Sequence, residues 1–194
     1  AQGGTVASNT VTAYIDETYT LPTPTYEGFS FVNWYTKPTG GTSIISGQTK
    51  MTESTITNTT LYAHWNLITY SLAYDWNNDA AESNPTKQTD LGYTNIVTLV
   101  EETELAGWEF KGWAFDSDAT EADFSAGQTL KNSGSSLGVT NDNATITLYG
   151  VWEKTPIEIT LDPQGGTVSS NSVTVYIGDT YSLPTPAYEG FTFI

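Results

Sequence analysis

The chain has 194 residues and no cysteine, and its 22 acidic side chains outnumber six basic ones, so the net charge at pH 7 is −16. Such a polyanion is repelled by nucleic-acid backbones and by anionic lipid surfaces, and no apolar run reaches the roughly 20 residues that span a bilayer. Nucleic-acid binding and membrane insertion are therefore not expected. With 38% hydrophobic and 13% aromatic residues, the chain has enough apolar material for small folded cores.

Residues 1–66 are predicted to form a small β module that lacks its first strand. Aromatic residues alternate after Gly28, at Phe29 and Phe31, and this period of two predicts a strand. A Pro-Thr-Gly-Gly cluster at residues 38–41 predicts a turn. The sequence TLYAHW at residues 60–65 predicts the closing strand. Very little helix is expected anywhere in the chain.

Residues 67–154 repeat this order of motifs and begin with an additional strand. The run ITYSLAY at residues 68–74 predicts that first strand, because apolar and polar side chains alternate. Residues 107–113 (GWEFKGW) then match residues 28–34 (GFSFVNW), and the closing LYGVW matches the earlier LYAHW. The polar stretch 76–96 departs from the pattern and is predicted to be an inserted loop between the first two strands.

Residues 155–194 have the pattern of the N-terminal half of a third repeat. The run IEITL at residues 157–161 predicts a strand, and Gly165-Gly166 provides a turn. A second strand is predicted at residues 173–177, and the Leu-Pro-Thr-Pro sequence that follows stops the strand pairing. Residues 164–194 match residues 2–32 with identity at 22 of 31 positions.

This repetition indicates a structural role, because tandem near-copies build stalks and arrays, whereas catalytic sites are seldom duplicated within one chain. The first repeat lacks a strand that the last repeat possesses. Two interpretations follow. The C-terminal strand of one chain completes the first repeat of another in a head-to-tail contact, or the ends fall at an arbitrary boundary inside a longer protein.

The succession of motifs resembles the Listeria–Bacteroides repeat, the B-repeat of internalin-type surface proteins. The resemblance is carried by QGGTV, Leu-Pro-x-Pro, G-[FW]-x-F-x-x-W and T-L-Y-x-x-W, in that order and spacing. It implies a mostly β fold of small β-grasp-like, ubiquitin-like modules in tandem, with little helix. It also implies a bacterial protein that is secreted or attached to the cell surface, and it brings no catalytic residues.

A candidate ligand-binding site lies at the start of the inserted loop. Variable loops on a rigid scaffold often carry binding residues, and an exposed tryptophan is a frequent contact residue. The candidates are Trp76, Asn77, Asn78 and Asp79, with Trp76 expected to be exposed. The tryptophans at repeat-defining positions are instead expected to fill the cores.

A candidate calcium site consists of four carboxylates within eight residues. These are Asp116, Asp118, Glu121 and Asp123. Calcium prefers six to eight oxygen ligands, but this loop lacks the glycine of the usual calcium-loop motif, so a solvated acidic loop is the favoured interpretation. No other cofactor is expected. Catalysis by His64, the single histidine, is not expected, because the second repeat has Val151 at the same position.

The sequence therefore predicts a non-enzymatic, extracellular structural repeat that acts as a stalk, spacer or self-assembling fibre. Its expected partners are neighbouring repeats of the same protein or further copies of the chain. The alternative is an adhesin module that binds a host protein or glycan through the inserted loop of the second repeat.

Overall fold

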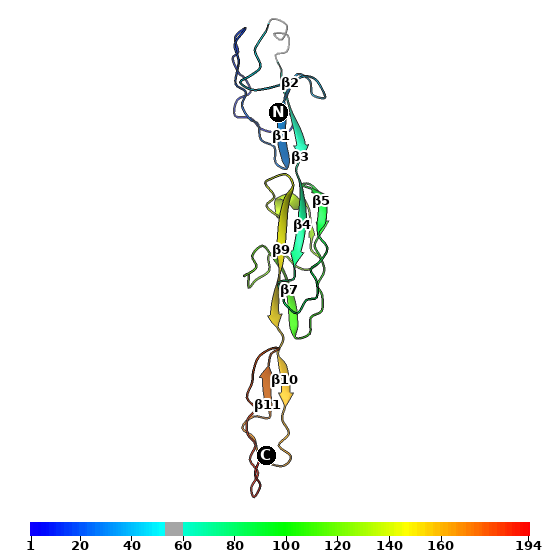
Figure 1. Ribbon diagram of the computed structural model, residues 1–194, viewed down its shortest axis with the longest axis vertical. Coiled ribbons are helices and arrows are strands. Elements are labelled where there is room, and N and C mark those ends of the chain that lie inside the picture. The colour runs from blue at the N-terminus through cyan, green and yellow to red at the C-terminus, as the bar shows by residue number, and fades with distance from the viewer. Residues whose placement is uncertain (53–59) are drawn as a thin grey trace. The chain divides into compact units, whose positions relative to one another are not determined.

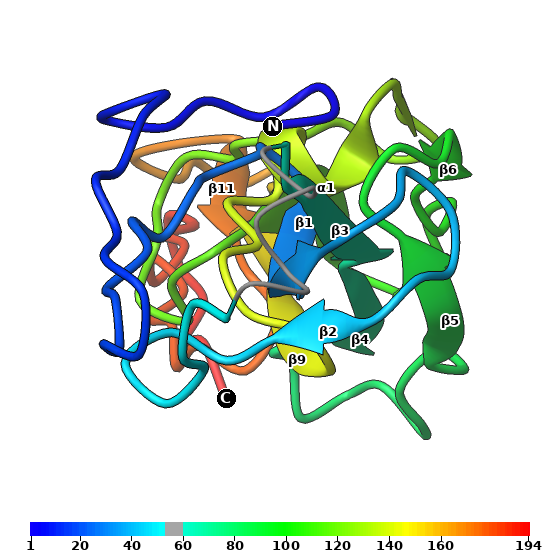
Figure 2. The ribbon, with the colours of Figure 1, turned by 90° about the horizontal axis from the view of Figure 1, so that it is seen from above.

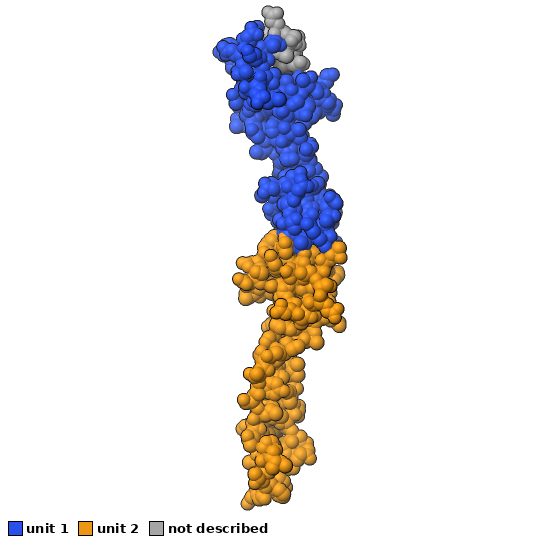
Figure 3. Space-filling model, in the orientation of Figure 1, with its two compact units in different colours: residues 1–73, 87–98, 129–146 blue, residues 74–86, 99–128, 147–194 orange. Residues whose placement is uncertain are grey.

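The computed structural model describes residues 1–52 and 60–194, which fold as two compact units (Figure 3). Unit 1 comprises residues 1–73, 87–98 and 129–146, and unit 2 comprises residues 74–86, 99–128 and 147–194. The repeats are named separately from these units. Repeat 1 is residues 1–66, repeat 2 is residues 67–154, and repeat 3 is residues 155–194.

Repeat 1 lies in unit 1 and contains a three-stranded antiparallel sheet. Strand β1 (Phe29–Tyr35) lies between β2 (Ser43–Ile44) and β3 (Tyr62–Leu67), as Figures 1 and 2 show. Trp34 on β1 and Ala63 on β3 are buried in a small core, and Phe31 packs against it. The predicted period of two does not continue along β1, because a β-bulge between Phe31 and Asn33 places Phe31 and Trp34 on the same face. Val6, Tyr19 and Leu21 pack against this core from the N-terminal segment.

Repeat 2 contains a four-stranded sheet and a two-stranded sheet. The larger sheet has the strand order β5-β4-β9-β7, formed by β4 (Thr69–Asp75), β5 (Gln88–Gly92), β7 (Trp108–Ala114) and β9 (Ala144–Lys154). The smaller sheet pairs β6 (Val97–Thr98) with β8 (Thr129–Leu130). The short helix α1 (Ser133–Ser136) follows β8.

Strand β4 shows how the sequence alternation becomes burial. Tyr70, Leu72 and Tyr74 are buried, and the residues between them are half-buried. The Tyr70 hydroxyl donates a hydrogen bond to Ser133 Oγ at 2.6 Å, which satisfies two buried polar groups within unit 1. Burial raises the pKa of Tyr70, an effect that this hydrogen bond partly opposes.

Repeat 3 lies in unit 2 and forms a two-stranded sheet. Strand β10 (Ile157–Thr160) pairs antiparallel with β11 (Ser172–Val175) (Figure 1). Residues 176–194 form no strand, and Phe191 and Phe193 are 72% and 65% exposed. The apolar side chains of this repeat are thus present, but much of their surface remains open to solvent.

The expectation of a mostly β chain with little helix is confirmed, and α1 is the only α-helix among the described residues. The predicted extent of the inserted loop, residues 76–96, is wrong. Strand β5 lies inside that stretch and pairs with β4 as β11 pairs with β10. The loop itself covers only residues 76–87. The side chains of β5 are mostly polar, so no alternation of apolar and polar residues indicated this strand, although its backbone pairs with β4.

The corresponding segment of repeat 1, residues 11–14, forms no strand. In repeat 3 the equivalent strand β11 is held by β10, whereas residues 11–14 pair with no strand among the described residues. Residues 15 and 18 form only isolated bridges, to Met51 and Lys50. An extended segment without a neighbouring strand has no ladder of backbone hydrogen bonds to hold it.

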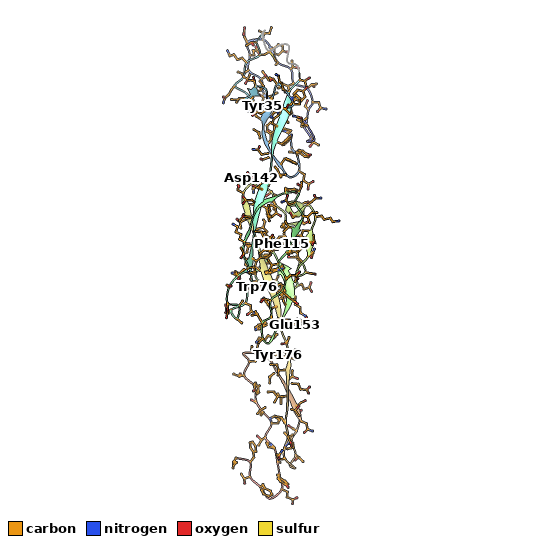
Figure 4. The ribbon with its side chains drawn as sticks, turned by 90° about the vertical axis from the view of Figure 1, so that its right-hand side faces the viewer. Tyr35, Trp76, Phe115, Asp142, Glu153 and Tyr176 are labelled. Carbon is orange, nitrogen blue, oxygen red and sulfur yellow. The ribbon has the colours of Figure 1, made fainter. Side chains whose placement is uncertain are left out.

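The start of β4 is capped by Asp142 of unit 1 (labelled in Figure 4). Thr69 donates its backbone N–H and its hydroxyl to Asp142 Oδ1, at 2.8 and 3.0 Å. These hydrogen bonds hold the pKa of Asp142 below its ordinary value of 3.8, because they favour the ionised carboxylate.

We predict that Asp142→Asn lowers the thermal unfolding midpoint at pH 7. Because the folded pKa is depressed, the stabilisation is present above the unfolded pKa and disappears as the pH falls through the folded pKa. Wild type and variant should therefore converge in strong acid, as differential scanning calorimetry across pH would measure. Glu121→Gln, an exposed carboxylate elsewhere, is the control and should follow the wild type. A difference for Asp142→Asn that persists undiminished at low pH would contradict this interpretation.

Candidate functional site

In repeats 1 and 2, one indole hydrogen bond links the N-terminal segment of the repeat to its closing strand pair, β1–β3 in repeat 1 and β7–β9 in repeat 2. Trp34 Nε1 donates to Pro22 O at 2.9 Å, and Trp113 Nε1 donates to Val100 O at 2.9 Å. Pro22 and Val100 occupy the same position of the repeat, since each follows a leucine of the core. A buried indole N–H needs an acceptor, and both repeats provide the same one.

A second indole hydrogen bond is also made twice. Trp65 Nε1 donates to Ala1 O at 3.0 Å, and Trp152 Nε1 donates to Trp76 O at 2.6 Å. Trp76 therefore stands where Ala1 stands in repeat 1. Its position belongs to the common framework of the repeat rather than to an inserted binding loop.

The side chain of Trp76 (Figure 4) is buried, with 7% of its surface exposed, so the expectation of an exposed contact residue is wrong. Its ring stacks on Trp113, with centroids 4.9 Å apart, and meets the edges of Phe110 and Trp152. Trp76 lies two residues beyond Tyr74 and so continues the inward face of β4. Gly150 allows this approach, since a Cβ at that position would lie 2.4 Å from Trp76 O.

Asn77, next to Trp76 in repeat 2, donates two hydrogen bonds to backbone carbonyls through its side-chain amide. Its φ is +55°, and its Nδ2 donates to Ser117 O at 2.7 Å and to Gly150 O at 3.3 Å. Gln2 of repeat 1 has φ +52°, and its Nε2 donates to the two equivalent carbonyls, Pro38 O at 3.0 Å and Ala63 O at 3.2 Å. The Nδ2 of Asn77 thus contributes to the fold, although the residue itself is exposed.

The other two candidates for ligand binding lie on the loop surface of unit 2. Asn78 is half-buried and accepts a hydrogen bond from Ala80 N at 3.0 Å through its side-chain oxygen, while Asp79 is exposed. Together with Glu82 and Ser83 they line an open hollow, whose other walls include Trp108 and Trp152. Of the four candidate residues, Trp76 is buried, whereas Asn77 lines this hollow together with Asn78 and Asp79.

The structure does not bring the four predicted calcium ligands together. Asp116, Asp118, Glu121 and Asp123 are all exposed. Asp116 accepts a hydrogen bond from Asp118 N at 2.9 Å, and Asp123 accepts one from Phe115 N at 2.9 Å. Among the residues that the structure describes, no three acidic, histidine or cysteine side chains gather as metal ligands. Asp116 and Asp123 thus shape their own loop by accepting local backbone hydrogen bonds.

His64 packs on the surface of β3 rather than in a catalytic cluster. Its ring stacks on Tyr35, with centroids 3.9 Å apart and planes 12° apart. One ring nitrogen lies 3.0 Å from Lys37 O. Stacking and a backbone hydrogen bond account for this histidine.

Two glycines form the junctions between successive repeats, and sequence reasoning missed them. Gly28 O accepts a hydrogen bond from Ile68 N at 2.9 Å within unit 1, and Gly107 O accepts one from Thr155 N at 3.0 Å within unit 2. Both glycines have φ +79°. Ile68 and Thr155 each precede the first strand of the following repeat. The same pair of atoms therefore joins repeat 1 to repeat 2 and repeat 2 to repeat 3.

A side chain of the following repeat covers each junction glycine. A Cβ at position 28 would lie 2.5 Å from the ring of Tyr93, and one at position 107 would lie 2.9 Å from Ile177 Cβ. Tyr93 and Ile177 occupy equivalent positions. Tyr93 lies two residues after the β5 residue that pairs with Tyr70 of β4, and Ile177 lies two residues after the β11 residue that pairs with Ile157 of β10. Only glycine combines this φ with so close a neighbour.

Polar contacts differ between the two junctions. Tyr93 Oη and Ser135 Oγ both donate to Glu27 Oε1, at 3.1 and 3.2 Å, at the first junction. At the second, Lys154 forms an ion pair with Asp179. Backbone geometry is shared, whereas the side chains around it vary. Two features of the sequence signal this site. One is the glycine that begins both G-[FW]-x-F-x-x-W motifs, and the other is the small number of residues between each closing strand and the first strand of the next repeat.

These contacts define a tandem array of β repeats, in which repeats 1 and 2 contain the same indole and amide hydrogen bonds and each repeat is joined to the next by the same junction. The chain belongs to the Listeria–Bacteroides repeat domain family, which matches residues 1–64 and 70–149. The resemblance inferred from the sequence motifs is thereby confirmed.

Two relatives in Evansella cellulosilytica carry similar sequences. One, named "Putative Gly-rich membrane protein", is 28% identical over 177 residues, which cover 86% of this chain and 19% of the relative. Another, named "Putative membrane protein", is 27% identical over 174 residues, which cover 88% and 23%. The chain thus spans about a fifth of the length of these curated relatives. No solved structure matches it. In residues 1–52 and 60–194, no helix has the length and apolar character needed to cross a membrane.

We predict that Asn77→Ala destabilises unit 2 by about 0.5–1.5 kcal/mol, because the exposed carbonyl of Ser117 and the buried carbonyl of Gly150 lose the hydrogen bonds that Asn77 donates. Urea unfolding followed by tryptophan fluorescence measures the change. Asp79→Ala, on the exposed surface two residues away, is the matched control and should change stability by less than about 0.5 kcal/mol. Equal effects of the two substitutions would show that the Asn77 amide does not fasten the fold.

Proposed function

We propose that the chain is a non-enzymatic structural segment, a stalk or spacer of an extracellular bacterial surface protein. The observation that carries this proposal is the junction, made twice by equivalent atoms around Gly28 and Gly107. An array needs a contact that each repeat can offer to the next. Its partners in this role are the neighbouring repeats of the same protein.

The junction limits motion between neighbouring repeats because very little chain is free. A single residue, Ile68, separates β3 from β4. Its N–H donates to Gly28 O, and its carbonyl accepts from Tyr93 N at 2.9 Å. At the second junction only residues 155 and 156 separate β9 from β10, and residue 156 is proline, whose φ is fixed. A swivel would have to break backbone hydrogen bonds.

The charge of the chain suits this role. At −16, neighbouring repeats and neighbouring molecules repel one another, which keeps an array soluble and opposes its collapse. Family membership and the names of the two relatives support a place at the cell surface.

An adhesin is the second candidate function. The observation in its favour is the hollow in unit 2, which Asp79, Glu82 and Trp108 all line. A host protein or glycan would meet acidic and amide groups there, beside an aromatic wall. Since Trp76 is buried, loss of binding in Asp79→Ala and Glu82→Ala, with unchanged unfolding, is the result that would support this function over the stalk alone.

We predict that Gly28→Ala loosens the junction between repeats 1 and 2. The new methyl group meets the Tyr93 ring, so the ring and its hydrogen bond to Glu27 must shift. The chain has no cysteine, so spin labels on cysteines introduced at Thr39 and Thr94 are unique. Electron–electron double resonance should give a narrow distance distribution for the parent and a broad one for the variant.

Gly40→Ala is the matched control. Gly40 also has a positive φ, +65°, but nothing lies within 4 Å of its added Cβ. Both variants therefore carry similar backbone strain, roughly 1–2 kcal/mol, and only one carries the clash. If Gly28→Ala leaves the distribution as narrow as Gly40→Ala does, the glycine junction does not hold the repeats together.

A further inference from the structure

Repeat 2 is connected to both of its neighbours through two strands that lie side by side. The chain enters this repeat from β3 through Ile68 into β4, and it leaves from β9 through Thr155. Strands β4 and β9 are hydrogen-bonded neighbours in the middle of the four-stranded sheet. Tension that is transmitted along the array therefore acts on this strand pair.

Contacts at the two ends of the pair show that the strands are parallel. Near the first residues of both strands, within unit 1, Asn143 N donates to Thr69 O at 2.8 Å. Near the last residues of both strands, within unit 2, Trp152 Nε1 donates to Trp76 O at 2.6 Å. The start of β4 thus lies beside the start of β9, and the end of β4 lies beside the last part of β9.

Parallel strands that are pulled from opposite ends must slide past one another. Tension along the chain pulls β4 at its first residue and β9 at its last residue, so the two forces point in opposite directions along the strands. Because the hydrogen bonds of a parallel pair are evenly spaced along it, they share this load and break together. Two strands that are pulled apart at the same end would instead lose these bonds one at a time.

The core of repeat 2 also opposes sliding of β4. Tyr70, Leu72 and Tyr74 are buried, and a slip of one residue would turn them to the opposite face of the sheet. The next register that keeps them inside lies two residues away, at about 7 Å along the strand. A shorter displacement therefore breaks hydrogen bonds without reaching another favourable register.

Side-chain hydrogen bonds connect the pair at both ends. Thr69, the first residue of β4, donates two hydrogen bonds to Asp142, which lies just before β9. Asn77, which lies just after β4, donates to Gly150 O on β9 at 3.3 Å. These bonds link the same two segments as the strand pairing does, so sliding of the strands must break them as well.

We propose that the β4–β9 pair is a mechanical clamp that keeps repeat 2 folded when the array is under tension. The inference rests on the proposed stalk function, because a stalk transmits force from one repeat to the next. It adds a direction to that function, since the repeat resists a pull along the chain more strongly than a pull that separates the two strands from one end. This resistance depends on the unfolding barrier rather than on equilibrium stability alone.

Pulling the same folded repeat in two directions tests the clamp. Cysteines introduced in pairs carry DNA handles for optical tweezers, and the natural chain has no cysteine that would compete. Asn66→Cys with Glu158→Cys loads the pair along the chain, through both junctions. Asn66→Cys with Asn141→Cys loads the two strands at the end that they share. The three replaced residues are exposed.

The unfolding force at one pulling rate should be at least about twofold higher along the chain than at the shared end, because the bonds then break together. Equal forces in the two directions, or a lower force along the chain, would overturn the proposal. Urea unfolding without load is the control and should give equal stabilities for the two cysteine pairs. If Asn141→Cys lowers the stability, Thr140, which is also exposed, replaces it as the attachment point.

Failure of the clamp and failure of the stalk function give different results. Equal forces in the two directions, with a narrow spin-label distance distribution across the first junction, would refute the clamp and leave the stalk in place. A broad distance distribution for the parent chain would contradict the stalk function itself, and the proposed role of the clamp would be lost with it.

Discussion

The array depends on a carbonyl group presented by a left-handed glycine. At φ +79°, Gly28 and Gly107 turn their carbonyls toward the N–H of the residue that precedes the next first strand. Any larger residue would be strained at this φ, and its Cβ would also clash with the side chain of Tyr93 or Ile177. The strand that closes one repeat therefore leads into the next with almost no free linker, and the two repeats share a backbone hydrogen bond rather than only a covalent connection.

Within repeats 1 and 2, side-chain hydrogen bonds hold segments that regular strand pairing does not hold. The N-terminal segment of repeat 1 is held by isolated bridges and by three groups, the indoles of Trp34 and Trp65 and the amide of Gln2. Repeat 2 makes the same bonds from equivalent positions. Because these bonds end on backbone carbonyls, the acceptor residues are free to vary, as Pro22 and Val100 do. This explains how a short repeat with modest sequence identity keeps one fold.

Periodicity predicted β4 and β10, because each is a clear alternation with a period of two. It predicted only the start of β1, at Phe29 and Phe31, because a β-bulge follows Phe31. The same alternation, extended two residues beyond Tyr74, predicts that Trp76 is buried. The expectation of an exposed Trp76 was wrong because the polar residues that follow it suggested an inserted loop. Strand β5 was missed because its side chains are polar while its backbone pairs with β4. The roles of Gln2 and Asn77 could not be predicted, since their acceptors lie far away in sequence and depend on a left-handed conformation that the residue type does not specify.

The central claim is that successive repeats share a backbone hydrogen bond at a glycine junction. Amide hydrogen exchange in the unmodified chain tests it directly, at the N–H groups of Ile68 and Thr155. Both amides should be protected to the level of β4 and β9, because each donates to a glycine carbonyl of the preceding repeat. Exchange of either amide at the rate of an open loop, with β4 and β9 still protected, would contradict the account.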